Sequence, residues 1–226
     1  MEQNQKQNWD TVKYHGRYNR YPFTEVVSYL MSSFNNEERQ SVKVLDLGCG
    51  GAHHLLFLAQ EKFDYHGVDG SEEALDIAKT RLIEKGFDVS GRLTKSNFDN
   101  LPFEENTFDV VIDRGSLVCN KYADIPPLIS EVFRVLKSQG RFFSMILNEL
   151  STAKNAATHI GDNDYVNHGG RLEDAGVLHY TNTDEMKTLF SAFEIDSIEL
   201  LTKIVDYPAS SNPSNDSWSI IKCRKP

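Results

Sequence analysis

Apolar runs of strand length alternate with segments of helical periodicity from about Ser41 onward. Val42–Leu47 and Phe63–Val68 are short apolar runs typical of buried strands, and His54–Gln60 between them predicts a short helix. A strand, a helix and a second strand in this order form one unit of a parallel sheet whose faces are covered by helices. The chain is therefore expected to fold as an α/β domain.

The alternation continues toward the C-terminus. Ser71 and Asp124 are candidate N-caps of two longer helices. A further helix opens at Thr181 or Thr183 and runs through Phe190. The remaining apolar runs predict strands at Phe87–Thr94, Phe108–Ile112, Arg141–Leu147, Phe193–Leu201 and Ser217–Cys223.

Charge and cysteine usage exclude several classes of partner. The chain has 24 Lys and Arg against 33 Asp and Glu, a net charge of −9, which repels polyanions and anionic membrane surfaces. We therefore expect neither nucleic acid nor a membrane as a partner. The three cysteines form no Cys-x-x-Cys pair, and the first ten residues contain no apolar signal-peptide core. Both features favour a reducing, cytoplasmic location.

The most specific motif is an apolar strand that carries Asp46 and runs into a turn with Gly48 and Gly50. Glycine lets a backbone approach a ligand where a side chain would block it. Asp69 ends the next strand 19 positions after Gly50, close to the roughly 20 positions that place a carboxylate on a ribose diol. The spacing predicts a nucleotide site, although Asp69 could also be an ordinary turn residue.

Charge narrows the choice of nucleotide. A dinucleotide fingerprint, Gly-x-Gly-x-x-Gly, would need glycine where this chain has His53, and Asp46 would repel a pyrophosphate. A ligand with an ammonium and a sulfonium group but no phosphate would instead be attracted by Asp46. A nicotinamide-linked oxidoreductase is therefore the less favoured alternative.

Residues 42–147 resemble the class I S-adenosylmethionine-dependent methyltransferases. Asp46–Gly51 is similar to the glycine-rich first motif of that family, with Ala52 in place of its third glycine. Asn97–Phe103 resembles the segment before the family's fourth strand, and Asp113–Leu117 locally resembles thiopurine-type methyltransferases. The resemblance implies an α/β fold with a doubly wound, mostly parallel, seven-stranded Rossmann-like sheet and helices on both faces.

The resemblance also implies which residues bind the cofactor, S-adenosylmethionine. The glycine loop would pack against its amino-acid part, Asp69 would hold the ribose hydroxyls, and Gly70 would lie beside the adenine. Asn97 would contact the adenine amino group, although it could also be a turn former, and Asp113 would face the methyl donor. With Asp46 and the backbone N–H of Phe98, the expected cofactor-binding residues are Asp46, Gly48, Gly50, Asp69, Gly70, Asn97, Phe98 and Asp113.

We expect one methyltransferase domain with four parts. Residues 1–36 would form an N-terminal cap, and residues 41–147 the cofactor-binding core. Residues 148–180, rich in Gly, Asn, Asp and His, would form a substrate lid, because a long polar stretch inside a compact domain is usually functional or mobile. Residues 181–226 would supply a C-terminal helix and closing strands, with the 208–216 loop as a further lid candidate.

Methyl transfer from a sulfonium is an in-line displacement that depends chiefly on positioning, so no fixed catalytic triad is required. A base helps when the acceptor is a hydroxyl or a protonated amine, and His168 in the lid is the leading candidate. The aromatic N-terminal segment could close over the site or simply pack on the sheet. The candidate substrate-binding residues are Tyr14, Tyr18, Arg20, Arg114 and Tyr165.

The acceptor is expected to be a small metabolite methylated on an O or N atom. DNA amino-methyltransferases of this fold carry an Asn- or Asp-Pro-Pro-aromatic element, and this chain has Asp113–Ser116 in its place. The histidines show no metal-ligand spacing, so no metal is expected. A non-catalytic S-adenosylmethionine-binding module is the main alternative, because fold alone does not establish chemistry. The sequence leaves the oligomeric state open.

Overall fold

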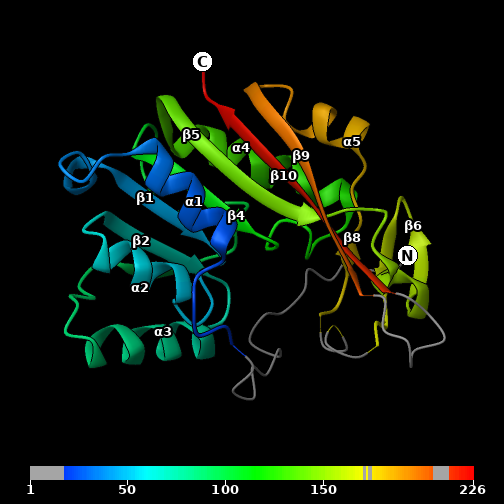
Figure 1. Ribbon diagram of the computed structural model, residues 1–226, viewed down its shortest axis with the longest axis horizontal. Coiled ribbons are helices and arrows are strands. Elements are labelled where there is room, and N and C mark those ends of the chain that lie inside the picture. The colour runs from blue at the N-terminus through cyan, green and yellow to red at the C-terminus, as the bar shows by residue number, and fades with distance from the viewer. Residues whose placement is uncertain (1–17, 170–171, 173–174, 206–213) are drawn as a thin grey trace.

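A seven-stranded sheet forms the centre of the protein (Figure 1). The structure is a computed structural model that describes residues 18–169, 172, 175–205 and 214–226. The strand order is β3-β2-β1-β4-β5-β10-β9. The strands are β1 (Lys43–Leu47), β2 (Asp64–Asp69), β3 (Leu93–Lys95), β4 (Phe108–Arg114), β5 (Leu136–Leu147), β9 (Glu194–Val205) and β10 (Ser214–Arg224).

Strands β1 to β5 run parallel, and β10 is antiparallel to both of its neighbours. The prediction of a mostly parallel seven-stranded sheet is therefore confirmed. The chain passes outward from β1 to β2 and β3, then returns to place β4 on the other side of β1, where Leu47 pairs with Asp113. At such a reversal the loops after the strands diverge and leave a crevice at the carboxyl ends.

Side chains from the helices divide between two hydrophobic clusters. One contains residues of α1, α2 and α3, and the other residues of α4 and α5. Burial of these apolar stripes against the sheet is the main force that holds each helix in place. The helices are α1 (Thr24–Ser33), α2 (His53–Gln60), α3 (Glu72–Glu84), α4 (Ile125–Val135) and α5 (Thr183–Leu189).

The helix starts agree only in part with the predicted caps. Ser71 caps α3, and its hydroxyl accepts a hydrogen bond from the Ala74 N–H at 3.3 Å. Asp124 occupies the N-cap of α4 without a side-chain bond. Helix α5 begins at Thr183, one of the two predicted starts, and its cap is Asn182, which forms a capping box with Glu185. In a capping box the N-cap side chain accepts from the N–H three residues later, and the glutamate there accepts from the N-cap N–H, so two otherwise unpaired donors at the helix start are satisfied.

The starts of two strands differ most from the prediction. Strand β3 covers only residues 93–95, because the chain turns at Gly91, whose φ is +66°. Strand β5 begins at Leu136, directly after α4 and earlier than predicted. A positive φ of 62° at Gln139 interrupts its regular backbone.

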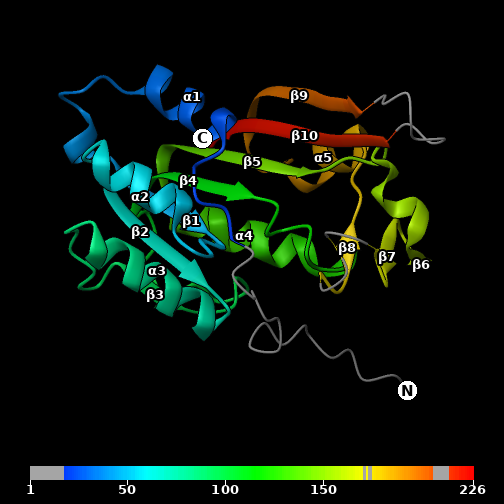
Figure 2. The same cartoon turned by 60° about the horizontal axis from the view of Figure 1, so that its bottom comes forward.

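Residues 148–180 contain regular structure that the sequence did not predict. Three short strands, β6 (Thr158–Gly161), β7 (Asp164–Val166) and β8 (Leu178–His179), form an antiparallel sheet. Figure 2 shows this sheet beyond the carboxyl ends of β4 and β5. Asp162 and Asn163 make the tight turn between β6 and β7 with positive φ values of 47° and 57°, which Asp and Asn tolerate better than most residues.

Candidate functional site

The glycine loop between β1 and α2 lies at the carboxyl end of the sheet, and its amides bind the neighbouring strand. The N–H groups of Gly48 and Cys49 donate to the Val68 carbonyl at 2.8 and 3.0 Å. Gly48 has a φ of +75°, and a Cβ there would lie 2.6 Å from the Ser116 Cβ. Gly50 has a φ of +47°, and a Cβ there would meet nothing within 4 Å. Gly48 is therefore required for packing, whereas Gly50 leaves space open.

Ala52 follows this loop in a conformation that glycine adopts more easily. Its φ is +64°, and it is the N-cap of α2. The family pattern has glycine at this position, and the structure supplies the reason, since a left-handed backbone costs an L-residue about 1–2 kcal/mol. The Ala52 methyl is fully buried, and that burial offsets part of the cost.

Asp69 lies beside the glycine loop and binds its backbone. Oδ2 accepts from the Gly50 N–H and Oδ1 from the Ser71 N–H, both at 2.9 Å. Burial raises the pKa of this carboxyl, although the two amide bonds oppose the rise. The acidic side chain predicted to hold a ribose therefore lies next to the loop predicted to hold the rest of the ligand.

Asp46 is 1% exposed and lies on β1 below the loop. Its Oδ1 is 3.3 Å from His54 Nδ1, whereas Oδ2 has no hydrogen-bond partner among the described residues. Its charge raises the pKa of Asp69 and also that of Asp113 on β4. The three carboxylates therefore share one electrostatic environment, and a buried acceptor atom without a donor fits an ammonium-bearing ligand.

Asp113 is the penultimate residue of β4 and is fully buried. Its Oδ1 accepts from the N–H groups of Ser116 and Leu117, and Oδ2 accepts from the Ser144 hydroxyl at 2.6 Å. Burial raises the pKa of Asp113 to about 6. Oδ1 thus holds the turn after β4 and Oδ2 binds β5, and a direct contact with the methyl donor would have to replace or share one of these bonds.

The predicted adenine contacts follow β2 and β3. Gly70 directly follows Asp69 and is half-buried. Asn97 is exposed, and Phe98 packs with its ring 3.4 Å from where a Gly48 Cβ would stand. The structure thus brings Phe98 to the glycine loop, and the adenine role of Asn97 stays a prediction.

Arg114 is the last residue of β4 and lies between two aromatic rings. Its Cζ is 3.8 Å from the centroid of Phe23 and 3.9 Å from that of Trp218. Its Nε is buried and has no hydrogen-bond partner among the described residues. Burial lowers the pKa of the guanidinium to about 10, so it remains charged at neutral pH.

The N-terminal segment reaches the glycine loop through Arg81 of α3. This arginine donates to the carbonyls of Gly51, Asn19 and Arg20, and its Cζ lies 5.0 Å from the Tyr18 ring centroid. The Tyr18 side chain lies against Gly51, with its Cβ and two ring atoms 3.1 to 3.2 Å from where a Gly51 Cβ would stand. Tyr18 therefore covers the loop, and the Arg20 side chain is exposed. Tyr14 lies outside the described residues.

The predicted base, His168, is buried within the lid segment. Its Nε2 lies 3.1 Å from the Tyr165 carbonyl, and its ring is 6.1 Å from that of Tyr180. Burial lowers the pKa of His168, which keeps the imidazole neutral at physiological pH. The contacts shown here are to the lid itself, so proton transfer by His168 stays a prediction.

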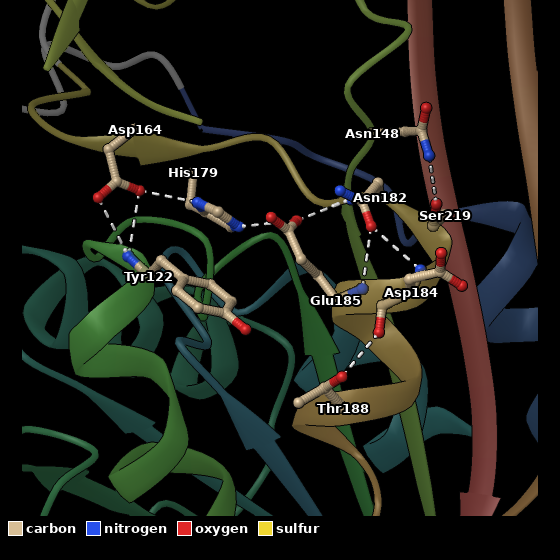
Figure 3. A network of polar contacts seen from close by, with 9 residues as sticks. All are labelled: Tyr122, Asn148, Asp164, His179, Asn182, Asp184, Glu185, Thr188 and Ser219. Carbon is tan, nitrogen blue, oxygen red and sulfur yellow. Dashed lines mark hydrogen bonds and ion pairs between the residues drawn. The ribbon is translucent and has the colours of Figure 1, made fainter. Parts of the chain in front are cut away.

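Sequence analysis missed a second lid histidine, His179, which lies between two carboxylates (Figure 3). Its Nδ1 is 2.7 Å from Asp164 Oδ1, and its Nε2 is 3.4 Å from Glu185 Oε2. Asp164 also accepts from the Tyr122 N–H. These contacts join β7, β8 and α5 beside an open depression of about 580 Å³ lined by Tyr122, Glu149, Asn182, Thr183, Asp184, Glu185 and Thr188.

His53 and His54 occupy the first turn of α2 and pack against Phe23. The ring of His53 meets Phe23 edge-on at 5.6 Å, and burial lowers its pKa to about 2. Arg81 and Trp218 were not singled out from the sequence, because nothing in local spacing links them to the glycine loop. Phe23 belongs to the aromatic N-terminal segment that was expected either to close over the site or to pack on the sheet.

The described part of the chain shows neither a helix suited to crossing a membrane nor a cluster of metal-ligating side chains. Among residues 18–169, 172, 175–205 and 214–226, no helix has the length and apolar character needed to cross a membrane. Over the same part of the chain, no group of three or more His, Cys, Asp or Glu side chains is arranged to hold a metal ion.

Comparison with known proteins gives the family. A family model described as a methyltransferase domain matches residues 38–194. The chain belongs to this methyltransferase family. The resemblance drawn from the glycine-rich motif is therefore confirmed, and so is the prediction of a methyltransferase at the level of the family.

Relatives with curated names are distant from this methyltransferase. An uncharacterized methyltransferase of Bacillus subtilis, YcgJ, is 28% identical over 159 residues, which cover 70% of this chain and 59% of that protein. A ubiquinone biosynthesis O-methyltransferase of Bartonella quintana is 26% identical over 180 residues, which cover 80% of this chain and 68% of that protein. This methyltransferase thus spans about three fifths of the length of the first relative.

Solved structures agree on the fold. A SAM-dependent methyltransferase of Methanosarcina mazei superposes with a TM-score of 0.68 at 20% identity, covering 91% of this chain and 98% of that one. The crystal structure of YcgJ gives a TM-score of 0.65 at 18% identity, covering 90% and 99%. At these identities the likeness establishes a shared fold and leaves the substrate of this methyltransferase to its own site residues.

Proposed function

We propose that this protein transfers the methyl group of S-adenosylmethionine to an O or N atom of a small metabolite by in-line displacement. The observation that carries the proposal is the buried Asp46 Oδ2, which lacks a described partner beside the glycine loop. A carboxylate oxygen in that position suits the ammonium of the cofactor's amino-acid part, because a buried polar atom without a hydrogen-bond partner is costly.

The other cofactor contacts follow from the loop geometry. Gly48 and Gly50 shape the backbone beside the amino-acid part, and Asp69 with Gly70 would hold the ribose and border the adenine. Asn97 and the Phe98 N–H would take the adenine, and Asp113 would act by fixing the turn that faces the methyl donor. When bound, the sulfonium supplies an already activated methyl group, so these residues need only orient it and exclude water.

The acceptor would lie between β4, the N-terminal segment and the lid. Arg114, Tyr18, Arg20 and Tyr165 are the proposed substrate residues, together with Tyr14 beyond the described part of the chain. His168 is the proposed base for an acceptor hydroxyl or amine. The Bartonella relative is named for O-methylation in ubiquinone biosynthesis, which supports a small organic acceptor in place of nucleic acid.

The remaining finer inferences concern fold and location. We infer a doubly wound arrangement with helices on both sheet faces, from the division of the helices between two hydrophobic clusters. Residues 148–180 would act as the substrate lid above the carboxyl ends of β4 and β5. Three free thiols, at Cys49, Cys119 and Cys223, support a reducing, cytoplasmic location.

Calorimetry with S-adenosylmethionine and S-adenosylhomocysteine tests the proposal. Both should bind the wild-type protein, and Asp69→Asn should weaken binding by about 1–3 kcal/mol through loss of a buried charged hydrogen bond. An amide oxygen at this position preserves an acceptor for a backbone N–H. Glu73→Gln, an exposed change on α3, is the matched control and should leave affinity unchanged. Failure of the wild-type protein to bind either compound would reject the function.

A further inference from the structure

The guanidinium of Arg114 presents only its edge. The rings of Phe23 and Trp218 cover its two faces at 3.8 and 3.9 Å. All five N–H bonds of a guanidinium lie in its plane, so stacking leaves them free to donate at the rim. Such a fork matches a planar carboxylate, which can accept two parallel hydrogen bonds.

No described residue supplies an anion to this cation. Within the described part of the chain, Nε is buried and unpartnered. Two nearby carboxylates have other partners, since both oxygens of Asp113 accept hydrogen bonds from the turn after β4 or from Ser144, and Asp216 Oδ1 accepts from Trp218 Nε1 at 2.8 Å. Their charges, with that of Glu25, oppose the lowering of the Arg114 pKa without forming an ion pair. A largely buried cation of this kind is costly unless a ligand completes it.

Arg114 belongs to the acceptor side of the site. Its two covering rings come from the segment before α1 and from β10, which lie outside the strands that carry Asp46 and Asp69. It still borders the cofactor region, because Phe23 also packs against His54 at 5.9 Å and His54 pairs with Asp46. A bare cation here would repel a sulfonium nearby, whereas a bound anion would neutralise it.

We propose that the methyl acceptor carries a carboxylate, which the edge of Arg114 binds in a bidentate pair. The inference rests on the proposed methyltransferase function and narrows its substrate class to small organic acids. Phe23 and Trp218 act as positioning residues that fix the guanidinium plane, so the acceptor is oriented before methyl transfer. The cofactor has a carboxylate of its own, and the experiment must separate the two.

Ligand-observed fluorine NMR on the protein loaded with S-adenosylhomocysteine provides the test. The probes are 4-fluorobenzoate and its neutral isostere, 4-fluorobenzamide. Wild-type protein should bind the acid at least tenfold more tightly than the amide. Arg114→Met, which keeps a long side chain between the rings, should abolish that preference, and Arg114→Lys should retain part of it. Equal binding of acid and amide, or no saturable binding of the acid, would overturn the inference.

A second experiment tests whether Arg114 binds the carboxylate of the cofactor and not that of the acceptor. Affinity for S-adenosylmethionine and for its decarboxylated analogue is measured by calorimetry on the wild-type protein and on Arg114→Met. The proposal predicts that Arg114→Met changes the affinity for S-adenosylmethionine and for its decarboxylated analogue by less than threefold relative to wild type. A tenfold loss for S-adenosylmethionine alone would assign Arg114 to the cofactor and overturn the inference. Wild-type protein that binds neither cofactor form rejects the methyltransferase function itself, a result distinct from both.

Discussion

Alanine at Gly50 and at Gly48 should separate the two reasons for a glycine in the cofactor loop. Both residues have positive φ, 47° and 75° respectively. A left-handed alanine costs about 1–2 kcal/mol, and the reduced entropy of the unfolded chain returns about 0.4–1 kcal/mol. Gly50→Ala should therefore lose about 1 kcal/mol of unfolding free energy, because its Cβ would meet nothing within 4 Å.

Gly48→Ala carries an additional steric cost. Its Cβ would stand 2.6 Å from the Ser116 Cβ and closer still to the hydroxyl of Ser116, so the loop or the turn after β4 must shift. Overpacking of this kind adds about 1–3 kcal/mol, giving a total loss of about 2–4 kcal/mol. Adding Ser116→Gly should recover much of it, since both crowded Ser116 atoms are then absent.

Thermal unfolding and calorimetry with S-adenosylhomocysteine measure the two effects. For a chain of this size, 1 kcal/mol shifts Tm by about 2–4 °C, so Gly50→Ala should melt only slightly below wild type. If the cofactor occupies the open space at Gly50, this variant should nevertheless lose at least tenfold in affinity. Wild-type affinity in Gly50→Ala, or equal melting losses in the two variants, would refute the assignment of Gly50 to ligand approach and Gly48 to packing.

Two further predictions concern charge and the N-terminal segment. The pKa of Asp113 in the folded protein is raised to about 6 from an ordinary 3.8, so between these values the folded protein binds more protons than the unfolded chain and stability falls as pH rises from about 4 to 6. Asp113→Asn should remove this slope and add up to about 3 kcal/mol of stability at pH 7. Urea unfolding at pH 4.5 and pH 7.5 measures the slope, and an equal change in stability between the two pH values in wild type and variant would contradict the prediction. A lysine in Arg81→Lys cannot maintain all three hydrogen bonds to backbone carbonyls, so hydrogen exchange of the Asn19 amide should speed up and affinity for S-adenosylhomocysteine should fall about fivefold. The control is Lys79→Ala, an exposed change on the same helix, which should alter neither quantity. An unchanged exchange rate in Arg81→Lys would show that Arg81 does not hold the N-terminal segment.

The sheet and the cofactor loop could be predicted because their signals are local. A buried parallel strand is a short apolar run, and a helix repeats apolar residues every three or four positions. The glycine turn and Asp69 follow two neighbouring strands at a spacing set by one helical crossover. Boundaries were less certain where a single backbone angle decided them, as at Gly91 before β3 and Gln139 within β5.

The surroundings of His179 and of Arg114 depend on contacts between residues that are far apart in the sequence. His179 gains its two carboxylates from β7 and α5, and Arg114 gains its two rings from opposite ends of the chain. No periodicity relates such partners, because strand order and packing bring them together only in the folded protein. The sequence alone determined the fold class and the glycine loop; the tertiary structure decided which polar groups of the described residues remain without a partner, because only folding brings distant residues together.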